Sequence, residues 1–198
     1  MTAVASDLEG RRMSLTDDVW RLDRIDRSSQ RLRMRPFVLG DVSDEYLSWL
    51  NDPWHMRFSN QRFVTHTPQS VADYLESFSG TSSLFLALEE ASTGRLAGTA
   101  TVYSSPHHGT ADVGLMVGVP FAGRHFGREA VECLREALFE QAFRKVTLGT
   151  SSRNLAMVGI LRSLAFLPDG VRIRQELVEG EEADILYFAS FRPSDANG

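Results

Sequence analysis

The feature that most constrains the fold is the stretch VGLMVGVPFAGRHFGREAV, in which an apolar strand passes through a short glycine-containing turn into an amphipathic helix. This arrangement directs several backbone N–H groups and the positive end of the helix dipole toward one spot. Gly123 and Gly127 remove side chains there, so a ligand can approach the backbone closely. Positive charge and hydrogen-bond donors come from Arg124, His125 and Arg128. We expect either an anion site or only a tight turn with solvated arginines.

The same stretch lacks the common nucleotide-binding motifs. No Lys-Ser or Lys-Thr pair follows its glycines, as a Walker phosphate loop requires, and the step from Gly123 to Gly127 does not fit G-x-G-x-x-G. With 21 basic and 26 acidic residues, the chain has no overall positive field, so we expect no nucleic-acid partner. An anionic ligand would have to be held by local groups.

Hydrophobic periodicity and turn residues predict the element order β-α-α-β-β-β-α-β-α-β-β. Thr67-Pro68 and Asn154 mark two of the helix starts. Pro168-Asp169-Gly170 is expected to end the last helix before a closing hairpin. A run of hairpins followed by β-α-β-α predicts an α/β fold, with a mixed, mostly antiparallel sheet and helices on both faces.

Length and composition predict one folded domain. The 198 residues, 42% of them hydrophobic, suffice for one sizeable core. We expect an N-terminal extension at residues 1–30, the domain at 31–193 and a short tail at 194–198. No apolar run approaches the ~20 residues that span a bilayer, and the N-terminus lacks the apolar core of a signal peptide. A cytoplasmic protein without a membrane partner is therefore expected.

Metal binding is not expected from the histidine and cysteine content. Cys133 is the single cysteine, which excludes a Cys-rich metal site and an intramolecular disulfide. His107 and His108 are adjacent in an expected turn, where two histidines seldom ligate one ion. We predict no metal cofactor.

From Arg31 to Phe191 the chain resembles the GNAT superfamily of acyl-CoA-dependent N-acetyltransferases. Four blocks match in order: YLSWLNDPWHMRF, ADVGLMVGVPFAGRHFGREA, KVTLGTSSRNLAMVGILRSLAF and the closing strand pair. The first block, with HTPQSVADYL, is similar to the subgroup of ribosomal-protein N-terminal and amino-sugar acetyltransferases. The family's turn signature, Arg/Gln-x-x-Gly-x-Gly/Ala, falls on residues 122–127, where Ala122 and His125 depart from it.

This resemblance implies acetyl-CoA as co-substrate, in a slot that opens where strand 112–117 parts from strand 145–150. An N–H near Met116 or Val117 would stabilise the oxyanion of the tetrahedral intermediate. Asn154 would contact the cofactor arm, although it also fits a plain helix N-cap. The implied cofactor site comprises Leu115, Met116, Val117, Gly123, Arg124, His125, Phe126, Gly127, Arg128 and Asn154.

The implied reaction is direct attack of a neutral amine on the thioester in a ternary complex, without a covalent enzyme intermediate. Asp112 aligns with the acidic residue often assigned as base in relatives, although it also fits a surface charge on its strand. Leu161 occupies the position of the tyrosine that protonates the thiolate in many relatives. Tyr103, Tyr187 or solvent would have to replace it.

Acceptor recognition is expected from the segment between the first two helices. Its candidate residues suit a sugar or a nucleotide-sugar phosphate but could instead form structural contacts; they are Trp54, His55, Arg57, Phe58, Asn60, Gln61 and Arg62. We therefore expect a small-molecule primary amine such as an amino sugar. Two alternatives stay open: acetylation of a peptide N-terminus, and a non-catalytic acyl-CoA-binding module. A homodimer is a further possibility.

Overall fold

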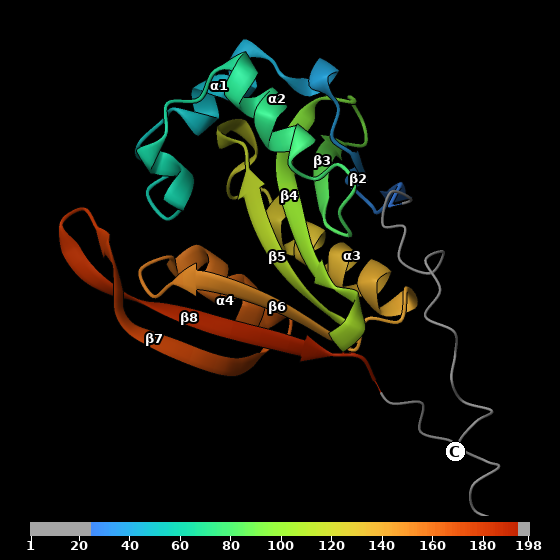
Figure 1. Cartoon of the computed structure of the whole chain (residues 1–198), viewed down its shortest axis with the longest axis vertical. Helices are drawn as coiled ribbons and strands as arrows, with labels where there is room; N and C mark the ends of the chain where they lie inside the picture. Colours follow the sequence, from blue (N-terminus) through green and yellow to red (C-terminus); the bar gives the residue numbers. More distant parts are fainter. Residues whose placement is uncertain (1–24, 194–198) are drawn as a thin grey trace, which may run out of the picture.

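Residues 25–193, which the computed structural model describes, form an eight-stranded sheet in the order β1-β2-β3-β4-β5-β6-β8-β7 (Figure 1). The strands are β1 (Arg27–Ser28), β2 (Leu32–Pro36), β3 (Leu84–Glu90), β4 (Leu96–Ser105), β5 (Thr110–Val117), β6 (Lys145–Ser151), β7 (Leu167–Val178) and β8 (Glu181–Phe191). All neighbouring strands are antiparallel except β5 and β6. The mixed, mostly antiparallel fold expected from the sequence is confirmed.

The α-helices of the described residues lie where hydrophobic periodicity predicts them: α1 (Asp44–Leu50), α2 (Pro68–Glu76), α3 (Phe126–Glu140) and α4 (Leu155–Ser163). Local capping explains their starts. The Ser43 side chain accepts a hydrogen bond from the Tyr46 amide, and Thr67 accepts one from the Ser70 amide. Helices α1 and α2 lie on one side of the sheet, and α3 and α4 lie on the other (Figure 1).

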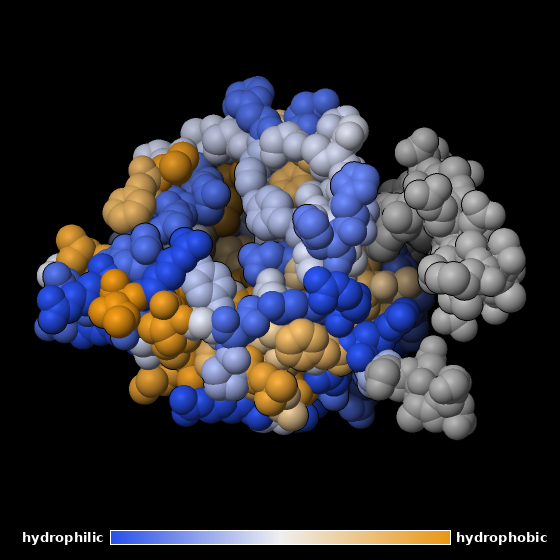
Figure 2. Space-filling view, turned by 60° about the horizontal axis from the view of Figure 1, so that its bottom comes forward, coloured by the Kyte–Doolittle hydropathy of each residue, from blue (hydrophilic) through white to orange (hydrophobic). Residues whose placement is uncertain are grey.

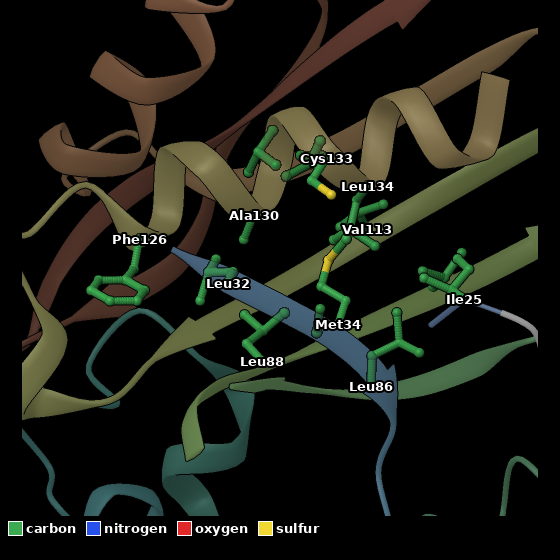
Figure 3. Close-up of a cluster of buried hydrophobic side chains, with 14 of the residues drawn as sticks. Ile25, Leu32, Met34, Leu86, Leu88, Val113, Phe126, Ala130, Cys133 and Leu134 are labelled. Atoms are coloured by element: carbon green, nitrogen blue, oxygen red, sulfur yellow. The ribbon is translucent and has the colours of Figure 1, made fainter. Parts of the chain in front are cut away.

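The core lies between α3 and the strands β2, β3 and β5 (Figure 3). The inward face of α3 predicted from the sequence is buried, and it consists of Ala130, Val131, Leu134, Ala137 and Leu138. Leu32, Met34, Leu86 and Leu88 meet this face from β2 and β3, each at most 1% exposed. Burial of each such large side chain stabilises the fold by about 1.5–3 kcal/mol. This packing fixes α3 against the strand that leads into it.

Two boundaries differ from the sequence expectations. The sequence predicts that the last helix ends at Pro168-Asp169-Gly170, but α4 has already ended at Ser163, and these residues lie within β7. The register of β7 on β8 shifts between Pro168 and Gly170. Since β7 is an edge strand, a bulge there tolerates proline and glycine. At the other end, β1 pairs with β2 ahead of the domain start expected at Arg31.

No helix within residues 25–193 is long and apolar enough to cross a membrane.

Close packing of β4 on β5 can be tested at Gly98. A Cβ added there would lie 2.2 Å from the Met116 backbone oxygen. We expect Gly98→Ala to lower the free energy of unfolding, measured in urea, by about 1–3 kcal/mol. Gly159 in α4 is the control, since no atom lies within 4 Å of its added Cβ. Gly159→Ala should raise stability by about 0.5–1 kcal/mol, and equal effects at both sites would contradict this packing.

Candidate functional site

The central feature of the site is a gap that opens between β5 and β6. These parallel strands pair only from Thr110–Lys145 to Asp112–Thr147, although β5 continues to Val117 and β6 to Ser151. Beyond Asp112, β5 stays paired with β4 on its other edge, and β6 stays paired with β8. The two halves of the sheet therefore part, and one edge of β5 is left open.

The register of β4 on β5 identifies the backbone groups on this open edge. Met116 lies opposite Thr99, and the Gly118 N–H donates to the Ala97 oxygen at 2.8 Å. Because hydrogen-bonded and non-hydrogen-bonded positions alternate along an antiparallel pair, the Met116 amide points toward β4. The N–H and C=O groups of Leu115 and Val117 point into the gap. Of the two N–H groups expected near the oxyanion, that of Val117 therefore lies on the open edge, and that of Met116 points toward β4.

The turn after β5 forms an N-terminal helix end suited to an anion. Gly123 and His125 both adopt left-handed backbone angles, with φ of 73° and 67°, and His125 directly precedes α3. The Glu129 N–H donates to the His125 oxygen, which leaves the earlier amides of the first turn of α3 without partners in the helix. Gly127 is buried, and a Cβ there would lie 3.3 Å from Ile160 of α4. These free amides fit a pyrophosphate group.

The two arginines of the turn differ in their environment. Arg124 donates to Glu90 at 2.8 Å, and the Glu90 side chain is mostly buried. A hydrogen bond from Thr93, and then the charge of Arg124, hold the pKa of Glu90 below its usual value. Arg128 is exposed and forms no hydrogen bond or ion pair with any described residue. Arg124 therefore secures the turn to β3, and Arg128 is the arginine available to a ligand.

Asn154 forms the N-cap of α4. Its side-chain oxygen accepts a hydrogen bond from the Met157 amide at 3.3 Å. This bond leaves the side-chain NH2 group of Asn154 without a partner in the described structure. The residue can therefore cap the helix and also donate to a ligand in the gap between β5 and β6.

Asp112 lies at the last paired position of β5 and β6, where the gap begins. Its carboxylate accepts a hydrogen bond of 2.6 Å from the Thr147 hydroxyl, and it lies opposite Tyr103 on β4. Although Asp112 reaches solvent, partial burial of its carboxyl raises the pKa, and the bond from Thr147 opposes this rise. The Tyr103 hydroxyl is 2.9 Å from the hydroxyl of Tyr74 on α2. Tyr187 lies beside Gly149, across the gap on β8.

A cavity of about 460 Å³ lies between α1, α2 and the face of β3, β4 and β5. It reaches the open edge of β5 at Leu115, and Figure 2 shows the molecule hollowed between these helices and the β7–β8 hairpin. Four residues expected to bind the acceptor, Trp54, Arg57, Phe58 and Arg62, do not line the cavity. Arg57 stacks on Trp54 and Phe58, and Arg62 donates to the Leu177 oxygen of the hairpin.

Sequence reasoning missed most of the residues that line the cavity. On α2, Ser70, Asp73, Tyr74 and Ser77 share one face at helical spacing, and this mixed polar face is the signal that could have indicated it. On the sheet, Thr99 and Thr101 alternate with inward-facing residues of β4, as a strand with one solvated face requires.

His55, which the sequence predicts to take part in acceptor recognition, lies near the gap. Its ring lies beside the Val117 carbonyl, and its Nε2 atom is buried without a hydrogen-bond partner in the described structure. Burial lowers the pKa of His55, so the imidazole is neutral near pH 7. A neutral ring next to the open edge of β5 can accept or donate one hydrogen bond.

Residues 31–167 match the family model described as an acetyltransferase (GNAT) domain. No protein of curated function matches the sequence significantly.

The fold is similar to several solved acetyltransferase structures. RimL, a ribosomal L7/L12 alpha-N-protein acetyltransferase in complex with coenzyme A, shares 14% identity over 86% of this chain and 99% of that chain (TM-score 0.75). Spermidine N-acetyltransferase from Vibrio cholerae, in complex with CoA and spermine, shares 15% identity over 83% of this chain and 97% of that chain (TM-score 0.73). The microcin C7 self-immunity acetyltransferase MccE, in complex with acetyl-CoA and AMP, shares 14% identity over 82% of this chain and 93% of that chain (TM-score 0.70). At these identities, the similarity shows the fold.

His125 provides a test of the anion-binding turn. A left-handed backbone costs a non-glycine residue about 1–2 kcal/mol, whereas glycine loses about 0.5–1 kcal/mol of chain entropy. We therefore expect His125→Gly to raise the free energy of unfolding by up to about 1 kcal/mol and to leave the dissociation constant for acetyl-CoA unchanged or lower. Titration calorimetry measures the second effect. Binding weakened tenfold would mean that the imidazole, not the backbone, holds the ligand.

Proposed function

Because the chain belongs to the GNAT family of acetyltransferases, we propose that it transfers the acetyl group of acetyl-CoA to the primary amine of a small molecule, by direct attack in a ternary complex. The observation that carries this proposal is the meeting of a cavity with an open strand edge. The cavity between α2 and the sheet reaches β5 at Leu115, where the backbone N–H points into the gap. Amine and thioester can therefore meet at this residue.

The pantetheine arm would bind as an additional strand along β5. Leu115 offers it an N–H and a C=O group, Val117 offers it an N–H group, and the amides that begin α3 lie at the end of the same edge. Since the arm runs from the pyrophosphate toward the cavity, the thioester carbonyl lies near Leu115. The N–H of Leu115 is then the donor best placed for the oxyanion, ahead of Val117 and Met116.

Asp112 supplies the base in this proposal. An ammonium substrate must lose a proton before its nitrogen attacks, and the carboxylate lies at the start of the gap with a raised pKa. One proton moves to Asp112 directly or through water, and the nitrogen–carbon bond forms. As the carbon–sulfur bond breaks, the nitrogen gives its second proton to the departing thiolate or to water. The thiolate is a stable leaving group, so neither Tyr103 nor Tyr187 has to act as acid.

The cavity favours a small acceptor over a protein. About 460 Å³ accommodates a compact molecule, whereas a peptide N-terminus requires a groove that continues along the surface. An amino sugar was predicted from Trp54, Arg57, Phe58 and Arg62, and these residues lie outside the cavity. Gln61, which also entered that prediction, does line the cavity. The proposal therefore keeps a small-molecule amine, and the sugar keeps only part of its predicted contacts.

The proposed activity is tested by release of free thiol from acetyl-CoA in the presence of a panel of primary amines. We expect amine-dependent release, together with calorimetric binding of acetyl-CoA and no binding of ATP. Binding without thiol release, for every amine, would favour the non-catalytic acyl-CoA-binding module instead.

Removal of the base should change the pH dependence of the reaction. Asp112→Asn is expected to lower kcat/KM about 10²–10⁴-fold where the amine is protonated, with a smaller loss at pH values where the amine deprotonates unaided. A variant as active as wild type at every pH would exclude Asp112 as base.

Thr147→Val tests the same assignment without removing the carboxyl. Thr147 donates to Asp112 and lowers its pKa, so loss of this bond should raise that pKa further. A base works only when deprotonated, so the acidic limb of the pH–rate profile should move to higher pH. A limb that moves to lower pH, or not at all, would contradict this role.

A further inference from the structure

The lining of the cavity carries an inference about the acceptor, which rests on the proposed function. The walls are largely apolar and aromatic. Leu50, Met56, Val71 and Phe85 line them, and these four side chains are all at most 8% exposed. Beneath them, the Thr101 side chain covers Gly114, where an added Cβ would lie 2.4 Å from its hydroxyl. A substrate that enters this space must exchange water for hydrocarbon contact.

Most polar side chains in the lining already have partners within the protein. The Tyr74 hydroxyl pairs with the Tyr103 hydroxyl, and His66 Nε2 lies 3.1 Å from the backbone carbonyl oxygen of Gln61. The Ser70 hydroxyl accepts a hydrogen bond from the Thr67 amide, and the Ser77 hydroxyl donates to the backbone carbonyl oxygen of Tyr74. Among the lining side chains that the structure describes, the Gln61 amide and the Thr101 hydroxyl have no partner, which is fewer groups than the several hydroxyls of a sugar require. A buried hydroxyl without a partner is costly, so the lining disfavours polyhydroxylated acceptors.

The two tyrosines of the wall also stay neutral. Burial raises the pKa of Tyr46 to about 12, and burial raises the pKa of Tyr74 as well. Neither phenol carries charge near pH 7. Neither therefore offers an anionic partner to a positively charged group of an acceptor deep in the cavity. The aromatic part of the surface on which an acceptor would lie is therefore uncharged.

One carboxylate lines the cavity, and it lies on an exposed residue. Asp73 on α2 accepts a hydrogen bond from Gln69 at 2.7 Å through Oδ1, which leaves Oδ2 without a partner in the described structure. No arginine or lysine is among the lining residues. An incoming ammonium is therefore attracted, whereas an acceptor with a carboxylate or phosphate group finds no cation to pair with.

We propose that the acceptor is a compact primary amine with an aromatic or aliphatic body and no anionic group. The apolar walls bind the body, and Asp73 attracts the ammonium form as it enters. The amino group then loses its proton and attacks beside Leu115.

The test compares phenethylamine, glucosamine, phenylalanine and a neutral tripeptide in the thiol-release assay, with acetyl-CoA binding measured in parallel. We expect kcat/KM for phenethylamine to exceed the value for glucosamine by at least about tenfold, since the sugar would bury unpaired hydroxyls. Phenylalanine has the same ring and an added carboxylate, so it should also be a poorer acceptor than phenethylamine. The amine of glucosamine is the less basic, so this preference cannot arise from easier deprotonation.

A matched pair of variants tests the role of Asp73. Asp73→Asn should raise KM for phenethylamine about threefold at low ionic strength and leave KM for acetyl-CoA unchanged. Glu76→Gln removes a neighbouring exposed carboxylate of α2 that does not line the cavity, and it should change neither constant. Equal effects of the two variants would overturn the role of Asp73.

The outcomes separate this inference from the proposed function. If glucosamine, phenylalanine or the tripeptide is preferred while acetyl-CoA binds and thiol is released, the apolar-amine inference is overturned and acetyl transfer stands. If acetyl-CoA does not bind and no amine releases thiol, the proposed function fails, and the inference fails with it.

Discussion

The arrangement of the site depends on the brief parallel pairing of β5 and β6. Three residue pairs join the two strands, and beyond Asp112–Thr147 each strand keeps only its outer partner. A sheet that stayed closed would use every backbone group of β5 in its own ladders. Because this one opens, the backbone groups of Leu115 and the N–H of Val117 are left without a partner strand, and the Val117 carbonyl lies beside the His55 ring. The same opening places Asp112 at the start of the gap, where partial burial raises the pKa of its carboxyl.

The surroundings of the gap are fixed by packing on both faces of the sheet. On one face, α3 is anchored by its buried side chains, and Gly127 allows its first turn to approach Ile160 of α4. On the other face, α1 and α2 stand over β3, β4 and β5 and enclose the cavity. In the proposed function, this acidic chain binds an anion through backbone amides at the start of α3, so the binding does not depend on net charge.

Local sequence signals were sufficient for the elements but not for their long-range contacts. Thr67-Pro68 and Asn154 predicted helix starts correctly, since a cap depends on residues three or four positions away. The edge strand β7 was partly missed, because its bulge at Pro168 is tolerated only through pairing with β8. The resemblance of the turn to an acetyltransferase family indicated the gap, and the register then distinguished Val117 from Met116. Neither the Arg124–Glu90 pair nor the lining of the cavity has a local signature, since both join segments far apart in the chain.

The central claim is that the open edge of β5 holds acetyl-CoA, and amide hydrogen exchange resolved by residue tests it most directly. Without ligand, the amides of Leu115 and Val117 should exchange faster than that of Met116, which β4 already protects. Saturating acetyl-CoA should slow exchange at Leu115 and Val117 and leave Met116 nearly unchanged. Unchanged exchange at both open-edge amides, with acetyl-CoA bound, would contradict the account.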